Sequence, residues 1–176
     1  NWITNLGVAD FYICFAVTDP EQGHSRGISA FVVEADRPGF SVGKLEHKMG
    51  IRGSPTGQPI FDNVRVPAEN LIGQENQGFK VAMGTLDRSR LGVAAQAVGI
   101  AQGATDYAAA YAQERRQFGK PIAAFQAIQF KLADMESRTA AARELLYRAC
   151  SKIDLDEPDL GKYSAMAKLI ASDTAM

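Results

Sequence analysis

The sequence predicts an α+β fold, in which a small antiparallel β-sandwich or barrel domain is followed by long antiparallel helices of a truncated four-helix bundle. Two observations support this class. Residues 1–72 contain short apolar runs separated by Gly and Pro turns, which is typical of strands. Residues 76–116 contain no proline and many alanines, which favours a helix. We therefore expect a β domain at 1–73 and the first part of a helical bundle domain at 74–176.

Four apolar runs in the first domain are expected to form its strands. They lie at residues 11–17, 28–33, 40–45 and 60–66. Short strands with turn signals between them predict a small all-β unit. His24 and His47 lie in loops, and we expect both to be solvated because neither has a partner at metal-ligand spacing.

The second domain is expected to begin with two helices that pack lengthwise. Positions on one face of the first helix recur at steps of three and four: Leu86, Arg90, Val93, Ala97, Ile100, Ala104, Tyr107 and Tyr111. The second helix repeats the pattern at Ile128, Leu132, Met135, Thr139, Ala142, Leu146 and Ala149. A repeat near 3.5 residues suits helices that cross at a shallow angle, as in a four-helix bundle.

Turn residues predict how these helices are connected. Gly119, Lys120 and Pro121 form a tight link, so the two helices should be antiparallel neighbours. Residues 151–159, which include Pro158, are expected to be a short linker before a third helix that starts near Leu160. The small residues Ala97 and Ala104 would let another helix approach closely, so an oligomer is plausible on packing grounds.

Charge and composition exclude several classes of function. The formal net charge is -1, so no basic face suggests nucleic acid as a partner. No apolar run approaches the roughly 20 residues that a membrane helix needs. Cys14 and Cys150 lie far apart in apolar surroundings, and we expect buried free thiols in a reducing compartment. Because neither has a metal-ligand partner nearby, no zinc site is predicted.

Both ends of the chain lack the usual boundary signals. The first residue is Asn1 rather than Met, and the last residues lie within a helix-like pattern that has no stop signal. We therefore expect the chain to be the middle of a longer protein.

Arg90 interrupts the apolar stripe of the first helix. A guanidinium is costly there unless it is paired or faces a polar ligand. Asp87 lies three residues earlier, within pairing reach on the same helix face. Two interpretations remain: a structural Asp87–Arg90 pair near a helix start, or a cluster that lines a pocket and contacts a polar ligand.

Arg115 and Arg116 stand at the expected end of the first helix. Cations are favoured there by the helix dipole, so a solvated cap is one explanation. Phe118, in the following turn, is not explained by that account. Arginine beside an aromatic residue also suits a flat phosphorylated ligand, with the guanidinium on the phosphate and the ring on the heterocycle.

Trp2 and Thr4 are two residues apart in a strand-like start, so we expect them to face the same side. They are either a half-buried aromatic beside a β-branched residue, or an indole and a hydroxyl that contact a planar cofactor. The sequence contains none of the common Gly-rich phosphate loops or the nucleophile motif GxSxG.

Several longer motifs resemble the flavoprotein acyl-CoA dehydrogenases, particularly the short- and medium-chain type. These motifs are WITN at 2–5, KMGIRGSPT at 48–56, FDNVRVPAENLIG at 61–73, GFKVAM at 78–83 and ERRQFGKPIAAFQAIQFKLADM at 114–135. The resemblance covers essentially the whole chain. It implies the middle β domain and the first helices of the C-terminal four-helix domain of a homotetramer, a dimer of dimers.

The resemblance also implies an FAD site. Arg115 would meet the pyrophosphate of the FAD of a neighbouring subunit, Phe118 would pack near its adenosine half, and Gln126 would add a contact. Some relatives carry histidine where this chain has Phe125. The segment Trp2, Ile3 and Thr4 would lie against the isoalloxazine, with Thr4 bonding near N5.

Acyl-CoA is the substrate that the resemblance implies. Asp87, Arg88, Ser89 and Arg90 match the segment that lines its site, and Ser25 falls in a loop that touches the CoA adenine. Isovaleryl- and long-chain-type relatives place the catalytic glutamate where this chain has Ser89. The general-base glutamate is therefore expected beyond Met176, and no residue of this chain is assigned as catalytic.

The implied reaction is flavin-dependent α,β-dehydrogenation of acyl-CoA to trans-2-enoyl-CoA in fatty acid β-oxidation, with hydride passing to FAD N5 and electrons to an electron-transfer flavoprotein. An acyl-CoA oxidase and a non-catalytic relative that uses the helices only for assembly are the alternatives. The expected location is the bacterial cytoplasm or the mitochondrial matrix, without nucleic-acid or membrane partners.

Overall fold

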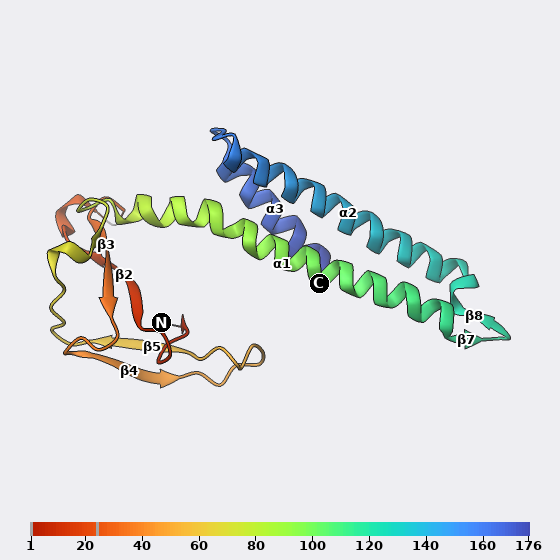
Figure 1. Cartoon of the computed structure of the whole chain (residues 1–176), viewed down its shortest axis with the longest axis horizontal. Helices are drawn as coiled ribbons and strands as arrows, with labels where there is room; N and C mark the ends of the chain where they lie inside the picture. Colours follow the sequence, from red (N-terminus) through yellow and green to blue (C-terminus); the bar gives the residue numbers. More distant parts are fainter. Residues whose placement is uncertain (1, 24) are drawn as a thin grey trace. The chain divides into compact units, whose positions relative to one another are not determined.

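The computed structural model describes residues 2–23 and 25–176, so His24 lies outside the described residues. The chain forms two compact units, Asn1–Met83 and Gly84–Met176. The first unit holds the two three-stranded β-sheets, and the second holds most of the helical residues together with a two-stranded hairpin (Figure 1). The units divide inside the first long helix, and the domain boundary expected at residue 73 stays a prediction.

The first unit contains two antiparallel three-stranded sheets, which confirms the predicted fold class. One sheet has the strand order β1-β5-β4, with β1 at Ile3–Thr4, β5 at Thr56–Phe61 and β4 at Phe40–Leu45. The other has the order β2-β3-β6, with β2 at Phe11–Val17, β3 at Ile28–Glu34 and β6 at Leu71–Ile72. The runs expected at 11–17, 28–33 and 40–45 are therefore strands.

The strand expected at 60–66 is wrong in its position. The strand here is β5, which begins at Thr56 and ends at Phe61, because it lies between β1 and β4 and both neighbours pair with Gly57. The backbone then turns through Asn63, whose φ is 52°. Val64 and Val66 follow the end of this strand. Both line a small hollow.

Aromatic rings join the two sheets. Tyr12 of β2 is buried and stacks on Phe40 of β4 with ring centroids 5.0 Å apart, and Phe40 meets the edge of Phe61 at 5.3 Å. The Tyr12 hydroxyl accepts a hydrogen bond of 2.8 Å from the backbone N–H of Gly7. This hydrogen bond satisfies the polar tip of a buried ring, so the contact stabilises the unit without an unpaired hydroxyl.

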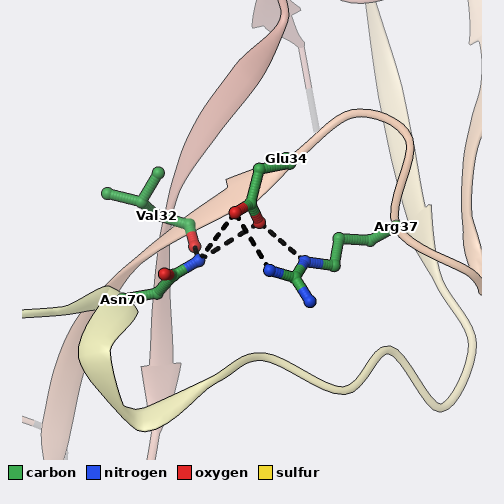
Figure 2. Close-up of polar contacts among 4 residues, drawn as sticks. All are labelled: Val32, Glu34, Arg37 and Asn70. Carbon is green, nitrogen blue, oxygen red and sulfur yellow. Dashed lines mark hydrogen bonds and ion pairs between the residues drawn. The ribbon is translucent and has the colours of Figure 1, made fainter.

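An acidic residue at the end of β3 organises the chain before the first helix (Figure 2). Arg37 donates two hydrogen bonds to the Glu34 carboxylate, at 2.7 and 3.0 Å. The Asn70 amide donates to Glu34 and also to the Val32 carbonyl, at 2.8 Å, which holds the 3₁₀ helix η2 (Ala68–Asn70) against β3. The hydrogen bonds from Arg37 are the main cause that lowers the pKa of Glu34 to about 2.

A ring of three polar groups holds the start of α1 (Gly78–Glu114) against the second sheet. The Asn76 N–H donates to the Ser29 hydroxyl, and Ser29 lies 2.7 Å from the Thr18 hydroxyl. Thr18 donates to the Asn76 side-chain oxygen at 2.7 Å, so the Ser29 hydroxyl is left to donate to Thr18 and the ring closes. Gly78 then lies directly on β3, where a Cβ atom would be 2.6 Å from the Ser29 carbonyl carbon.

The second unit contains the greater part of α1 together with α2 (Gln126–Asp154) and α3 (Leu160–Ala175). Its core is a contact between the three helices through small side chains. The members are Leu91, Ala94, Ala97, Val98, Ala142, Leu146, Ala149, Ala167 and Ala171. Alanine at these positions lets the helix backbones approach closely, and the predicted stripe of α2 is buried at Thr139, Ala142, Leu146 and Ala149.

The predicted stripe of α1 is wrong as the face that packs within this chain. Leu86, Val93, Ile100, Tyr107 and Tyr111 are exposed, and Ala104 is exposed with them. The buried face of α1 carries Leu91, Ala94, Ala97, Val98, Ala101, Thr105 and Ala112, and Ala97 is the one residue that it shares with the predicted stripe. Helix α1 is apolar on two faces. The spacing of its large residues marks one face, whereas the face that packs against the other helices is lined mostly by alanine.

The linker expected at 151–159 is also too long. Helix α2 continues to Asp154, and Lys152 is buried on its last turn. A short hairpin and the 3₁₀ helix η3 (Ile122–Ala124) separate α1 from α2, where a single tight link was expected.

Three further findings concern the described residues alone. No helix among them is long and apolar enough to cross a membrane, and no cluster of His, Cys, Asp or Glu in this part of the chain could hold a metal ion. Cys14 and Cys150 are free and only half-buried, so the expected burial is partial. Burial raises the pKa of the Cys14 thiol.

Replacing Glu34 by Gln should remove one contribution to the pH dependence of stability. The folded-state pKa of Glu34, about 2, lies below its ordinary value of 4.5, so the unfolded state binds the proton more readily. The stabilisation is therefore complete above about pH 4.5 and disappears as the pH falls towards 2. Urea midpoints of wild type and E34Q should differ most at pH 5–6 and converge near pH 2. A constant difference across this range would contradict the assignment, and Glu21→Gln is the exposed control.

Replacing Gly78 by Ala should destabilise the first unit by about 1–3 kcal/mol, because the added methyl would collide with β3 backbone that cannot rotate away. The same change at Gly84, where nothing lies within 4 Å, should stabilise the helix by about 0.5–1 kcal/mol. Denaturant unfolding of both variants measures the difference. Equal effects of the two substitutions would show that the contact with Ser29 is unimportant.

Candidate functional site

A tight β-hairpin joins the end of α1 to the start of α2, and we call residues 115–126 the helical elbow. Its strands, β7 (Arg116–Gln117) and β8 (Lys120–Pro121), enclose a two-residue turn. Both turn residues have positive φ, 51° at Phe118 and 81° at Gly119, as a type I′ turn requires. Glycine adopts this conformation freely, whereas phenylalanine rarely does. The strained backbone turns the Phe118 ring outwards.

The two arginines of the helical elbow have different surroundings. Arg116 donates a hydrogen bond of 3.1 Å to the Gly119 carbonyl and so stabilises the hairpin. Among the described residues, the Arg115 guanidinium has no hydrogen-bond or ion-pair partner, although its backbone is held by Tyr111 and Ile122. Arg115 is thus an exposed cation on a fixed backbone, which suits the binding of an anionic ligand.

Aromatic residues complete the elbow. The Phe118 side chain is 92% exposed, and its ring meets the Phe125 ring edge-on at 6.1 Å. The Lys120 ammonium lies 4.5 Å from the centre of the Phe125 ring. Gln126, the first residue of α2, is exposed nearby in the sequence. The helical elbow thus presents a guanidinium, an exposed aromatic ring and a primary amide. Together these groups suit the binding of a phosphorylated heterocycle.

The other predicted cofactor segment lies at the edge of the first sheet. Ile3 and Thr4 form the short strand β1 and pair with Gly57 and Thr56. Trp2 does not belong to this strand because its φ is 54°, so the expectation that Trp2 and Thr4 face the same side from strand alternation is wrong. Both side chains are exposed, the indole by 73%.

The loop at residues 46–55 borders this edge and is internally ordered. The Lys48 ammonium donates to the Ser54 carbonyl at 2.6 Å, and Arg52 donates to the Lys48 carbonyl at 3.0 Å. The Ser54 hydroxyl donates to the Asn5 side chain at 2.9 Å, which connects the loop to the residue after β1. These polar contacts give a structural role to the single Lys, Arg and Ser of the KMGIRGSPT motif.

Ser25 lies in a hollow of about 570 Å³ in the first unit. The lining residues are Gln22, Ser25, Arg26, Glu75, Asn76, Gln77, Phe79 and Lys80. Arg26, from the same turn as Ser25, and Lys80, from α1, line this hollow and supply two cations. Sequence reasoning selected neither residue, and no motif joins Lys80 to a position as distant in the chain as Ser25.

The four residues predicted at the start of α1 do not form one surface. Arg90 donates a hydrogen bond of 3.2 Å to the Asp87 carboxylate, and both side chains are half-buried. Arg88 and Ser89 are exposed on other faces of the helix. The predicted pairing of Asp87 with Arg90 is therefore confirmed, whereas the ligand contact of this segment remains a prediction.

Two family models match the chain in succession. The model for the middle domain of acyl-CoA dehydrogenase matches residues 1–64, and the model for the C-terminal domain of acyl-CoA dehydrogenase matches residues 76–176. The chain belongs to the acyl-CoA dehydrogenase family.

Similar proteins agree with this assignment. An acyl-CoA dehydrogenase of Bacillus subtilis is 54% identical over 177 residues, covering 99% of this chain and 46% of that protein. The structure of butyryl-CoA dehydrogenase from Megasphaera elsdenii superposes with a TM-score of 0.93 at 51% identity, covering 98% of this chain and 45% of that one. A chain in the structure described as the electron transferring flavoprotein of Acidaminococcus fermentans has a TM-score of 0.92 at 51% identity, with the same coverage.

This acyl-CoA dehydrogenase chain spans about half the length of the curated relatives that it matches. Activity, substrates and partners therefore concern the intact protein in which these two units occur.

Proposed function

We propose that the intact protein is a flavin-dependent dehydrogenase that converts acyl-CoA thioesters to trans-2-enoyl-CoA. The helical elbow carries this proposal, because it exposes a strained Phe118 beside Arg115, whose guanidinium has no partner in the part of the chain that the structure describes. Because the chain belongs to the acyl-CoA dehydrogenase family, flavin-dependent dehydrogenation is the reaction that we assign to the intact protein.

FAD is the cofactor of this family, and the donor set of the elbow fits it. Arg115 would hold the pyrophosphate, Phe118 would lie near the adenosine half and Gln126 would donate from its amide. Trp2, Ile3 and Thr4 would form the exposed surface against the isoalloxazine, where the Thr4 hydroxyl can donate a hydrogen bond. FAD, when bound, accepts a hydride and stores two electrons.

The length of α1 supports a cofactor shared between two copies. From Asp87 to Glu114 the helix covers 27 residue steps, or about 40 Å at 1.5 Å per residue. The elbow and the Asp87–Arg90 pair of one copy are thus too far apart to contact the same flavin and its substrate. An elbow that serves the flavin of another copy removes this difficulty, and we propose a homotetramer built as a dimer of dimers.

The substrate contacts are proposed on the basis of charge and position. Asp87, Arg88, Ser89 and Arg90 would lie beside the acyl-CoA. The hollow around Ser25, with its cations Arg26 and Lys80, would suit the phosphorylated nucleotide end of CoA. Ser89 offers no carboxylate, so the general base that removes the α-proton would be a glutamate beyond Met176. Apolar surroundings would make that carboxylate a stronger base.

Electrons are proposed to pass to an electron-transfer flavoprotein, a partner suggested by the similar chain from Acidaminococcus fermentans. An acyl-CoA oxidase is the alternative, because it would use the same two units and return the electrons to oxygen.

The test of this function is anaerobic titration of the purified intact protein with acyl-CoAs of increasing chain length. We expect the flavin absorbance to bleach with at least one of them, because substrate oxidation reduces the flavin. A protein that carries flavin but is bleached by no acyl-CoA would contradict the proposal. Oxygen consumption during turnover would favour the oxidase, and reduction of an artificial acceptor without it would favour the dehydrogenase.

Replacing Arg115 by Ala should weaken FAD retention by roughly 10- to 100-fold and lower oligomer stability, because a charge-assisted hydrogen bond contributes about 1.5–3 kcal/mol. The measurements are the flavin-to-protein ratio after dialysis and the mass in solution. Arg65→Ala removes an exposed arginine of the other unit and should change neither. Unchanged flavin content in the Arg115 variant would count against its assignment.

A further inference from the structure

Lys152 is a charged residue that is almost completely buried. Its side chain is 3% exposed on the last turn of α2. The ammonium donates to the Asp159 carboxylate at 2.6 Å and to the Glu157 carboxylate, and it lies 4.2 Å from the centre of the Tyr163 ring. We call these four residues the Lys152 clasp. A buried ammonium requires such partners, and here two carboxylates accept hydrogen bonds from it while an aromatic ring covers it.

The clasp joins the end of one helix to the start of the next. Asp159 is the residue before α3, and Tyr163 lies on the first turn of α3. Hydrogen bonds to Asp159 and Glu157 raise the pKa of Lys152, and the bond from Lys152 lowers the pKa of Asp159. The groups that face Lys152 thus favour its charged form. A backbone hydrogen bond of 3.0 Å, from the N–H of Glu157 to the carbonyl of Lys152, holds the same turn.

The remainder of α3 buries small side chains, with Leu160 and Ala175 partly buried against the same core. The residues that it buries are Ser164, Ala167 and Ala171. Such small side chains form shallow ridges, so they permit close approach but resist sliding and rotation poorly. Directional polar contacts at one end can add to the definition of its register, a role for which buried charges are suited.

The first turn of α3 lies directly against the predicted substrate segment of α1. A Cβ atom built on Gly161 would be 3.1 Å from one Asp87 carboxylate oxygen and 3.3 Å from the carboxyl carbon. The absence of a side chain at Gly161 therefore lets Asp87 occupy its position. Asp87 in turn accepts the hydrogen bond from Arg90 at 3.2 Å.

We propose that the Lys152 clasp is a positioning device for Arg90: it fixes the first turn of α3, which holds Asp87, which orients the Arg90 guanidinium. Lys152 and Gly161 are positioning residues, because neither contacts Arg90 directly. That Arg90 meets the polar part of acyl-CoA rests on the proposed function, whereas the orientation of Arg90 does not.

Gly161→Ala in the intact protein tests the contact on which the proposal depends. The methyl should displace Asp87 and release Arg90, so that phenylglyoxal modifies Arg90 several-fold faster, with the exposed Arg88 as internal reference. The KM for acyl-CoA should rise about tenfold with a smaller change in kcat, since small misplacements of positioning groups have effects of this order. Flavin content should be unchanged, and the Tm should be unchanged or higher because alanine favours helix.

Gly103→Ala is the matched control. It makes the same substitution in a helix where nothing lies within 4 Å of the added carbon. We expect wild-type KM and a wild-type rate of Arg90 modification. An equal rise in KM and an equal acceleration of Arg90 modification in both variants would overturn the proposal. Such a result would be caused by alanine in any of these helices and not by the contact with Asp87.

Lys152→Met tests the clasp itself by removing the charge at similar side-chain length. It should accelerate Arg90 modification as Gly161→Ala does, and the double variant should show less than the sum of the two effects, because both act through the same turn. The rates of Arg90 modification should be compared at a temperature well below the Tm of each variant. A faster rate there reflects a change in the position of Arg90 and not unfolding.

The outcomes also distinguish this inference from the proposed function. A protein that no acyl-CoA bleaches would refute the function, and Arg90 modification would still decide the inference. Wild-type modification rates in both Gly161→Ala and Lys152→Met would overturn the inference even if acyl-CoA were oxidised normally.

Discussion

The alanine-lined contact among three helices is the interaction on which the second unit depends. Ala94, Ala142, Ala149, Ala167 and Ala171 are completely buried, one or more on each helix. Because the buried side chains of α3 are small, α2 and α3 approach closely, and a few larger residues such as Leu91 and Leu146 fill the rest of the core. Small side chains resist sliding poorly, so polar contacts at the helix ends add to the definition of the register of α3.

Both candidate sites of the second unit lie at places that this packing holds. The Asp87–Arg90 pair lies where α3 begins, and the helical elbow lies where α1 ends and α2 begins. Neither site belongs to the packed core, but each is attached to helices whose positions the core determines. Most of the length of α1 separates these two candidate sites within one copy.

Backbone strain accompanies exposure at the candidate cofactor surfaces. Phe118 and Trp2 both have positive φ, and both present aromatic side chains to solvent. A bulky residue in the left-handed region costs free energy, and such strain often gathers at functional sites, which is why these two residues are candidates. In contrast, the buried Tyr12 of the first unit has its hydroxyl paired within the chain.

The sequence by itself determined the order of the elements, the α+β class and the family. Proline and glycine punctuation located β2, β3 and β4, and the stripe of α2 was readable because its larger residues and its buried face coincide. Tertiary structure alone decided which face of α1 is buried, since alanine contacts carry little periodic signal. It also brought together Lys152 with Asp159, Gly161 with Asp87, and Ser25 with Lys80. Such contacts depend on distances between separate elements, which residue spacing along one chain does not encode.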